Sequence, residues 1–170
     1  MEIREERPED YAAIHALVKA AFAGVQHADG NEQDLVAALR KEAAYIPGLA
    51  LVAEETGRIV GHVLFTKAQV GLAEVVALAP LAVLPAHQGK GVGSALIQAG
   101  HKAARALGYA YSVVLGRADY YPRFGYVLAD TLGILPPFEV PRENFMACKL
   151  TPSAPAISGT IVYAKAFGLG

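Results

Sequence analysis

Three glycines stand close together near the middle of the chain, where a segment with helical periodicity begins. They are Gly89, Gly91 and Gly93 in the stretch QGKGVGSAL, residues 88–96. A glycine inside a helix costs roughly 1 kcal/mol relative to alanine, so their placement needs a compensating role. A helix N-terminus carries unpaired N–H donors and about half a positive charge, and glycines let an anion approach these donors closely. The pattern predicts a phosphate or pyrophosphate site, at whose mouth Gln88 and Lys90 can add side-chain donors.

The glycine spacing does not match the common nucleotide-binding motifs. Counted from Gly89, the dinucleotide fingerprint G-x-G-x-x-G needs a glycine where the chain has Ser94. The P-loop pattern G-x-x-x-x-G-K-[ST] also fails, because Lys90 is followed by Gly91. A nucleotide is therefore disfavoured, and a glycine turn that only packs against a sheet stays open as an alternative.

The elements that would position this turn follow from hydrophobic periodicity. Residues 74–83 form a nearly continuous apolar run, typical of a strand covered on both faces. Pro80 within it lacks a donor for the strand pairing and predicts a bulge or a local splitting of the strands. Apolar residues then recur every three to four positions over 92–107, and residues 109–116 form another apolar run. Strand, turn, helix and strand predict a right-handed βαβ unit over roughly 74–116.

The remainder of the chain predicts helices and mostly antiparallel strands in one domain. Helical periodicity covers 8–23 and 31–44, a hairpin turns at Thr56-Gly57, and further strands are expected at 145–151 and 159–166. No linker or repeat divides the 170 residues, which suit a single domain, 1–170. The expected fold class is α+β (mixed α/β), with a central mixed, mostly antiparallel sheet around the βαβ core.

Composition excludes several classes of function. A net charge of −1 offers no attraction for nucleic acid, and the longest apolar run, residues 75–86, is too short for a membrane helix of about 20 residues. The charged N-terminus lacks a signal region, and the single Cys148 excludes an internal disulfide, so we expect a cytoplasmic protein. We expect Cys148 to be a buried thiol without a nearby histidine. An apolar fraction of 54 % is compatible with a homodimer interface.

Two stretches resemble the motifs of the GCN5-related N-acetyltransferase (GNAT) family. LAVLPAHQGKGVGSALI is similar to its acyl-CoA-binding motif, through Gln88, Gly91 and Gly93. DYYPRFGYVL resembles the family's Y-x-x-x-G-F/Y segment, with Tyr121 in the tyrosine position. The C-terminal stretches PPFEVPRENFMACKL and SGTIVYAKAF resemble the tail of its YhbS-like bacterial subgroup.

The resemblance implies a binding mode for coenzyme A and an activity. The backbone of the turn would wrap the pyrophosphate, by position at Gln88, Gly89, Lys90, Gly91, Val92, Gly93 and Ser94. The flanking strands would splay, and the pantetheine arm would pair with the strand edge at Leu81, Ala82 and Val83. The implied reaction moves acetyl from acetyl-CoA to a primary amine of a small molecule or peptide, by direct attack in a ternary complex and without a metal. A CoA-binding sensor or interaction module that has lost catalysis is the alternative.

The resemblance also suggests catalytic groups. Tyr121 is the candidate general acid for the leaving thiolate, although it could instead belong, with Tyr120 and its neighbours, to an aromatic cluster covering the sheet. A backbone N–H near Val83 would bind the oxyanion. Glu74 opens the central strand and is a candidate general base, acting directly or through water, or else an ordinary solvated acid at a strand end. The position of the glutamate used by some family members holds Leu78 here.

Other candidate groups have weaker support. His87 adjoins the turn and is expected to face solvent or phosphate, and a water chain could replace any single base. His27, Asp29 and Glu32 form a polar cluster without the ligand spacing of a metal site. The resemblance to the family implies that this loop lines the acceptor pocket. His62 lies on a hairpin strand and has no partner that the sequence can name.

Overall fold

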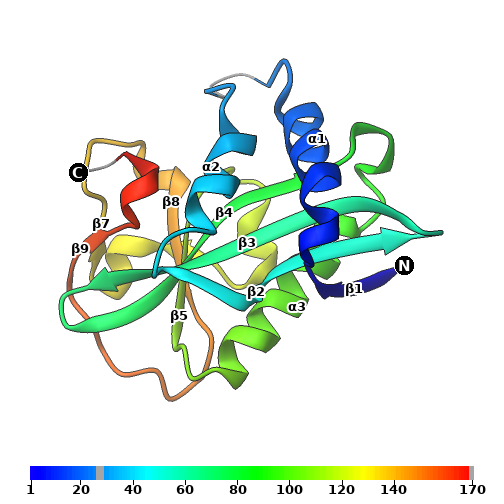
Figure 1. Cartoon of the computed structure of the whole chain (residues 1–170). Helices are drawn as coiled ribbons and strands as arrows, with labels where there is room; N and C mark the ends of the chain where they lie inside the picture. The colour runs from blue at the N-terminus through cyan, green and yellow to red at the C-terminus, as the bar shows by residue number, and fades with distance from the viewer. Residues whose placement is uncertain (26–28, 169–170) are drawn as a thin grey trace.

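The chain folds into an open, largely antiparallel sheet with helices on both faces (Figure 1). The computed structural model describes residues 1–25 and 29–168. The strands run in the order β1-β2-β3-β4-β5-β8-β6, and β9 pairs with both β3 and β7. β4 and β5 are parallel, as are β7 and β9, and the other described pairs are antiparallel. The strands are β1 (Glu2–Glu5), β2 (Tyr45–Glu55), β3 (Arg58–Val70), β4 (Ala73–Val83), β5 (Tyr111–Leu115), β6 (Val127–Leu128), β7 (Ile134–Leu135), β8 (Phe145–Lys149) and β9 (Gly159–Val162).

Alternating side chains of the long central strands build a core on each face of the sheet. α1 (Tyr11–Phe22) and α2 (Glu32–Leu39) cover one face, and α3 (Val92–Ala106) covers the other. On β3, Val63 and Phe65 pack on the α3 side, while Leu64 packs on the α1 and α2 side. β4 is buried on both faces, as its continuous apolar run predicts.

The main elements expected from the sequence are confirmed, with differences at their ends. β4, α3 and β5 form the predicted βαβ unit. The second helix ends at Leu39 rather than at residue 44, because the chain turns there to enter β2. The last strand ends at Val162 and is followed by a short 3-10 turn, η6 (Lys165–Phe167). The short strands β6 and β7 are not predicted from the sequence, since two residues carry no readable periodicity.

Candidate active site

The turn between β4 and α3 is held by glycines in the left-handed backbone region. Gly89 has φ +75° and Gly91 has φ +86°, and a Cβ atom added at either would meet nothing within 4 Å. Backbone conformation, rather than crowding, therefore favours glycine at both positions. Gly91 is the N-cap of α3 and makes no side-chain cap hydrogen bond. Since the N–H of Ala95 makes the first helical bond, to the carbonyl of Gly91, the earlier N–H groups point beyond the helix and suit an anion.

Side chains at the mouth of the turn have separate roles. The Gln88 amide donates to the carbonyl of Val83 over 3.0 Å and so ties the turn to the end of β4. The backbone N–H of Gln88 donates to the carbonyl of Pro85. Lys90 is exposed. Gln88 therefore braces the turn instead of standing free at its mouth, and the anion-binding capacity lies in the backbone from Gly89 onward.

β4 and β5 diverge directly beyond the pairs that join them. Their parallel ladder consists of the pairs Val76–Ser112 and Ala77–Val113. Over the described residues, the rest of β4 up to Val83 pairs with β3, whereas β5 continues along β8. The predicted splayed strand pair is thereby confirmed, and it opens toward the N-terminus of α3.

The bulge expected at Pro80 lies in the diverging part of β4. The register between β3 and β4 shifts there, between the pairs Phe65–Leu78 and Val63–Leu81. Two β4 residues are accommodated opposite one residue of β3, which is the arrangement of a bulge. This prediction is confirmed, and it re-aims the part of the strand that borders the opening.

The backbone groups of β4 alternate in direction along the opening. The N–H of Leu84 donates to the carbonyl of Val60. Because hydrogen-bonded and non-hydrogen-bonded pairs alternate in an antiparallel ladder, Ala82 directs its N–H and C=O toward β3, and Leu81 and Val83 direct theirs into the opening. Of the three residues expected to pair with a pantetheine arm, Leu81 and Val83 thus turn these groups away from β3, where the Val83 carbonyl accepts the Gln88 amide, and Ala82 turns its groups toward β3.

Tyr121 lies behind the opening, in an aromatic cluster. It begins the 3-10 turn η3 (Tyr121–Phe124), and its ring packs on Gly116, where an added Cβ would collide with the ring. The ring makes edge contacts with Tyr120 and Tyr126, at centroid distances of 5.1 and 5.7 Å. Burial raises the pKa of the Tyr121 hydroxyl, which therefore stays protonated at neutral pH, as a general acid must.

The candidate bases are not gathered around Tyr121. Glu74 is exposed near the start of β4, and its charge acts on Tyr109 at the entry to β5, whereas Tyr121 follows the far end of β5. Leu78, at the family's glutamate position, is buried in the core on the α3 side. His87 is half-buried in the 3-10 turn η2 (Pro85–His87), next to the glycine turn. Glu74 is thus at the closed end of the strand pair, away from the opening.

A buried polar cluster lies beneath the aromatic one. The Tyr126 hydroxyl lies 2.9 Å from Nε2 of His101 and 2.7 Å from Oγ of Ser112. Cys148 is buried as expected, but its sulfur lies 3.9 Å from His101 Nε2, so the expectation of no nearby histidine is wrong. Burial raises the pKa of Cys148 to about 12 and lowers that of His101 to about 4. Cys148 is therefore protonated at neutral pH and does not provide a thiolate nucleophile.

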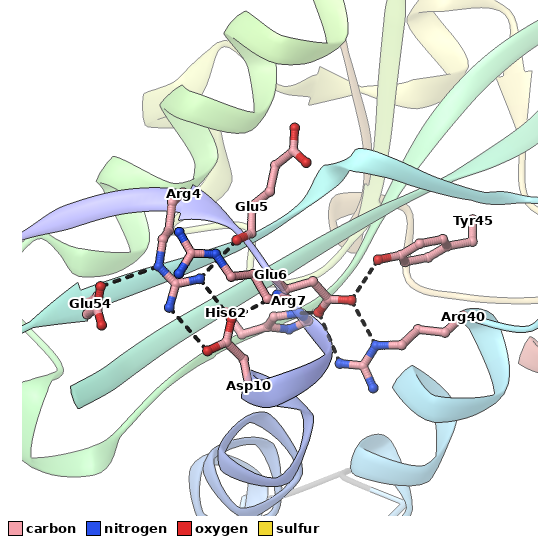
Figure 2. Close-up of polar contacts among 9 residues, drawn as sticks. All are labelled: Arg4, Glu5, Glu6, Arg7, Asp10, Arg40, Tyr45, Glu54 and His62. Atoms are coloured by element: carbon pink, nitrogen blue, oxygen red, sulfur yellow. Dashed lines mark hydrogen bonds and ion pairs between the residues drawn. The ribbon is translucent and has the colours of Figure 1, made fainter. Parts of the chain in front are cut away.

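A second polar cluster, which the sequence does not predict, joins the segment after β1 to the end of α2, the start of β2 and the middle of β3 (Figure 2). Glu6 accepts two hydrogen bonds from Arg40, at 2.8 and 3.0 Å, and one from the Tyr45 hydroxyl at 2.7 Å. His62 Nε2 lies 2.9 Å from the same carboxylate, and both side chains are buried. His62 therefore has a partner, which comes from the segment after β1 and is 56 positions away in the sequence.

An adjoining ion-pair cluster fixes the start of α1 (Figure 2). Arg4 reaches both carboxylate oxygens of Asp10, at 2.8 and 3.1 Å, and Glu54 at 3.3 Å. Asp10 also accepts the backbone N–H of Arg7. These contacts stabilise the first turn before α1. None of them involves a residue of the glycine turn, so we assign them a structural role.

Metal-binding side-chain groups and membrane-spanning helices are both missing from the described residues. Over 1–25 and 29–168, no three His, Cys, Asp or Glu side chains gather as a metal-binding group. His27 lies outside the described residues, while Glu32 accepts the backbone N–H groups of Asp29 and Gly30. In the same described part of the chain, no helix is both long and apolar enough to cross a bilayer.

Comparisons with known proteins place these features in one family. The model of the Acetyltransferase (GNAT) family matches residues 8–126, which include the glycine turn and Tyr121. Among curated proteins, the Escherichia coli K12 N-acetyltransferases YjhQ and YhbS, both described as uncharacterized, are 39 % and 35 % identical to the chain. The matches cover 77 % of both chains for YjhQ, and 76 % of this chain and 75 % of the relative for YhbS.

Two solved structures extend the match over nearly the whole chain. A GNAT family acetyltransferase from Brucella melitensis, in complex with acetyl-CoA, has a TM-score of 0.81 at 36 % identity and covers 98 % of this chain and 97 % of its own. YhbS from Escherichia coli, in complex with CoA, has a TM-score of 0.89 at 30 % identity, with coverage of 98 % and 91 %. The splayed β4–β5 pair, the uncapped glycine turn and these matches agree: the chain belongs to the GNAT family of acetyltransferases.

Proposed function

We propose that this protein transfers the acetyl group of acetyl-CoA directly to a primary amine of a small molecule or peptide, with both substrates bound together. The observation that carries the proposal is the divergence of β4 from β5 beside an uncapped helix N-terminus. The acetyl-CoA and CoA complexes of two similar proteins support it.

The residues around the opening fit this donor. The first turn of α3 offers N–H groups and a partial positive charge to the pyrophosphate. The backbone N–H and C=O of Leu81 are directed so that an amide-bearing arm can pair with them, as an added strand would. The Val83 carbonyl accepts the Gln88 amide, which leaves the Val83 N–H for the oxyanion. We assign the pyrophosphate to the backbone of residues 89–94, with Gln88 as a brace.

The transfer needs one bond to form and one to break. The amine nitrogen, after loss of one proton to solvent, attacks the thioester carbonyl carbon and forms a tetrahedral intermediate. The carbon–sulfur bond then breaks, and the nitrogen releases its second proton to water, from which Tyr121 regains the proton that it gives to the sulfur. The Val83 N–H, which faces the opening, stabilises the oxyanion, and the Tyr121 hydroxyl gives its proton to the leaving sulfur. Because Glu74 lies near the start of β4, before the pairs that join this strand to β5, we assign the removal of the amine proton to water rather than to Glu74. The buried Cys148 takes no part.

Release of free thiol tests the proposal. Purified protein is incubated with acetyl-CoA and a panel of polyamines, aminoglycosides, amino acids and peptides, and free CoA is measured with a thiol reagent. We expect thiol release above the amine-free rate with at least one acceptor class, together with an acetylated product by mass spectrometry. Binding of CoA without turnover on any amine would instead indicate a sensor.

A further inference from the structure

The Tyr120 side chain lies against the first turn of α3, and the family motif gives it no role. It directly precedes η3 and is half-buried. A Cβ atom added at Gly93 would lie 2.6 Å from the Tyr120 hydroxyl oxygen and 3.8 Å from Cδ2 of Leu81. The phenol therefore reaches from the segment after β5 to the first turn of α3, next to a β4 residue whose backbone faces the opening.

Neighbouring side chains hold the Tyr120 ring in place. Tyr121 and Phe124 contact it edge-on, with centroids 5.1 and 5.2 Å away. The guanidinium carbon of Arg123 lies 4.8 Å from the ring centroid, and its Nε donates to the Tyr120 carbonyl over 3.1 Å. Arg123 thus contacts both the ring and the backbone carbonyl of Tyr120 and holds the residue in this orientation.

The position of the hydroxyl defines what it can bind. Its oxygen lies beside Gly93, the second residue of a helix without a side-chain cap, where the positive end of the helix favours the oxygen. The hydroxyl hydrogen is then best directed away from the helix, toward an acceptor along the edge of β4. A phosphopantetheine arm in this place offers carbonyl and phosphate oxygens, which accept such a bond.

We propose that Tyr120 is a CoA-binding residue whose hydroxyl donates a hydrogen bond to an oxygen of the phosphopantetheine arm, and that Arg123 is the positioning residue that holds it. The inference rests on the proposed function, because it takes CoA as the ligand. It also gives Gly93 a role different from that of Gly89 and Gly91: a side chain there would displace the phenol.

Calorimetric titration of CoA tests the role of the hydroxyl. Tyr120→Phe is compared with wild type and with Tyr163→Phe, a matched control beyond β9. Loss of one hydrogen bond should raise the Kd of CoA about three- to tenfold and leave the control unchanged. Adenosine 3′,5′-bisphosphate, which lacks the arm, should bind Tyr120→Phe and wild type equally.

Each other outcome is decisive. If the wild-type protein binds no CoA, the proposed function itself is wrong. If the wild-type protein binds CoA and Tyr120→Phe binds it with the same Kd, only this inference is overturned. An equal loss with adenosine 3′,5′-bisphosphate would move the contact off the arm and also overturn it. A large fall in kcat at unchanged Kd would make Tyr120 a proton donor instead.

Arg123 is tested in two backgrounds. Arg123→Gln should raise the Kd of CoA in wild type but add nothing in Tyr120→Phe, because a positioning residue acts through the group it holds. An equal effect of Arg123→Gln in both backgrounds would show that Arg123 contacts CoA independently, and would overturn its positioning role.

Discussion

His62 Nε2 lies 2.9 Å from Glu6 Oε1, in a place closed to solvent. Burial would raise the pKa of Glu6, but hydrogen bonds from His62, Arg40 and Tyr45 lower it to about 2. Burial also lowers the pKa of His62, which is therefore neutral. Because the ionised carboxylate can only accept, Nε2 carries the ring proton. The pair joins the segment after β1 to the middle of β3, while Arg40 and Tyr45 extend it to the end of α2 and the start of β2.

Glu6→Gln should destabilise the fold strongly. The change leaves the largely buried Arg40 without its counter-charge, and removing one partner of a buried pair costs about 3–5 kcal/mol. Urea unfolding measures the loss. Glu55→Gln, at an exposed glutamate of the same sheet, is the control. Equal stabilities of the two variants would show that the cluster contributes nothing.

Stability should fall as the pH drops below about 6.5. The pKa values of His62 and His101 are lowered in the folded state, from 6.5 to about 4 for His101, so the unfolded chain binds more protons over this range. Glu6, with its pKa lowered from 4.5 to about 2, adds a further loss as the pH falls below about 4.5. Urea unfolding at several pH values from 7.5 to 4 measures the slope. A flat profile between pH 7 and 5 would contradict the neutral buried state of both histidines.

Gly91→Glu should abolish the rise in melting temperature that CoA causes. The position has φ +86°, which disfavours any side chain, and the new carboxylate would repel the pyrophosphate at the end of α3. Gly57→Glu, at φ +77° in the β2–β3 turn, carries the same backbone penalty away from the site and serves as the control. If CoA stabilises both variants as it does wild type, the turn is not the pyrophosphate site.

Tyr121→Phe should lower kcat by about 100-fold while the Kd of CoA stays within about twofold. A general acid contributes a factor of this order, and the ring itself still packs on Gly116 and Tyr126. Steady-state rates at saturating acetyl-CoA, together with calorimetry, make the comparison. Full activity in Tyr121→Phe would show that Tyr121 has only a structural role.

Gly93→Ala should lower the stability of the fold, although alanine has a higher helix propensity than glycine. Alanine in place of a helical glycine would by itself add roughly 1 kcal/mol of stability, but here the methyl group meets the Tyr120 hydroxyl. In the Tyr120→Phe background the obstructing oxygen is gone, so the same substitution should become neutral or stabilising. Urea unfolding of the four-member cycle gives the coupling. Equal effects in both backgrounds would show that the two residues do not touch.

Local sequence signals predict the framework of the site well. The apolar run of β4, the bulge at Pro80 and the glycine turn each depend on a few adjacent residues, and all three appear where expected. The Glu6–His62 pair could not be predicted from the sequence, because its residues are 56 positions apart and meet only through the register of the sheet.

Tyr120 shows a related limit of the motif itself. The family pattern draws attention to Tyr121, yet the contact between Tyr120 and Gly93 depends on how closely the segment after β5 approaches α3. No spacing rule along the chain encodes that approach. For the same reason the distance of Glu74 from the opening follows only once β4 and β5 are aligned.

The short ladder between β4 and β5 has a mechanical consequence. It lies between two blocks of the sheet, β1–β4 on one side and β5, β8 and β6 on the other, which are also joined by the chain through α3 and by the chain from β8 to β9, a strand that pairs with β3. An arm that pairs with Leu81 acts as an extra strand between these blocks. Binding of acetyl-CoA should therefore stabilise the contact between the two blocks. The affinity for acetyl-CoA and the free energy needed to separate the blocks are then linked, so a change in one can be measured as a change in the other.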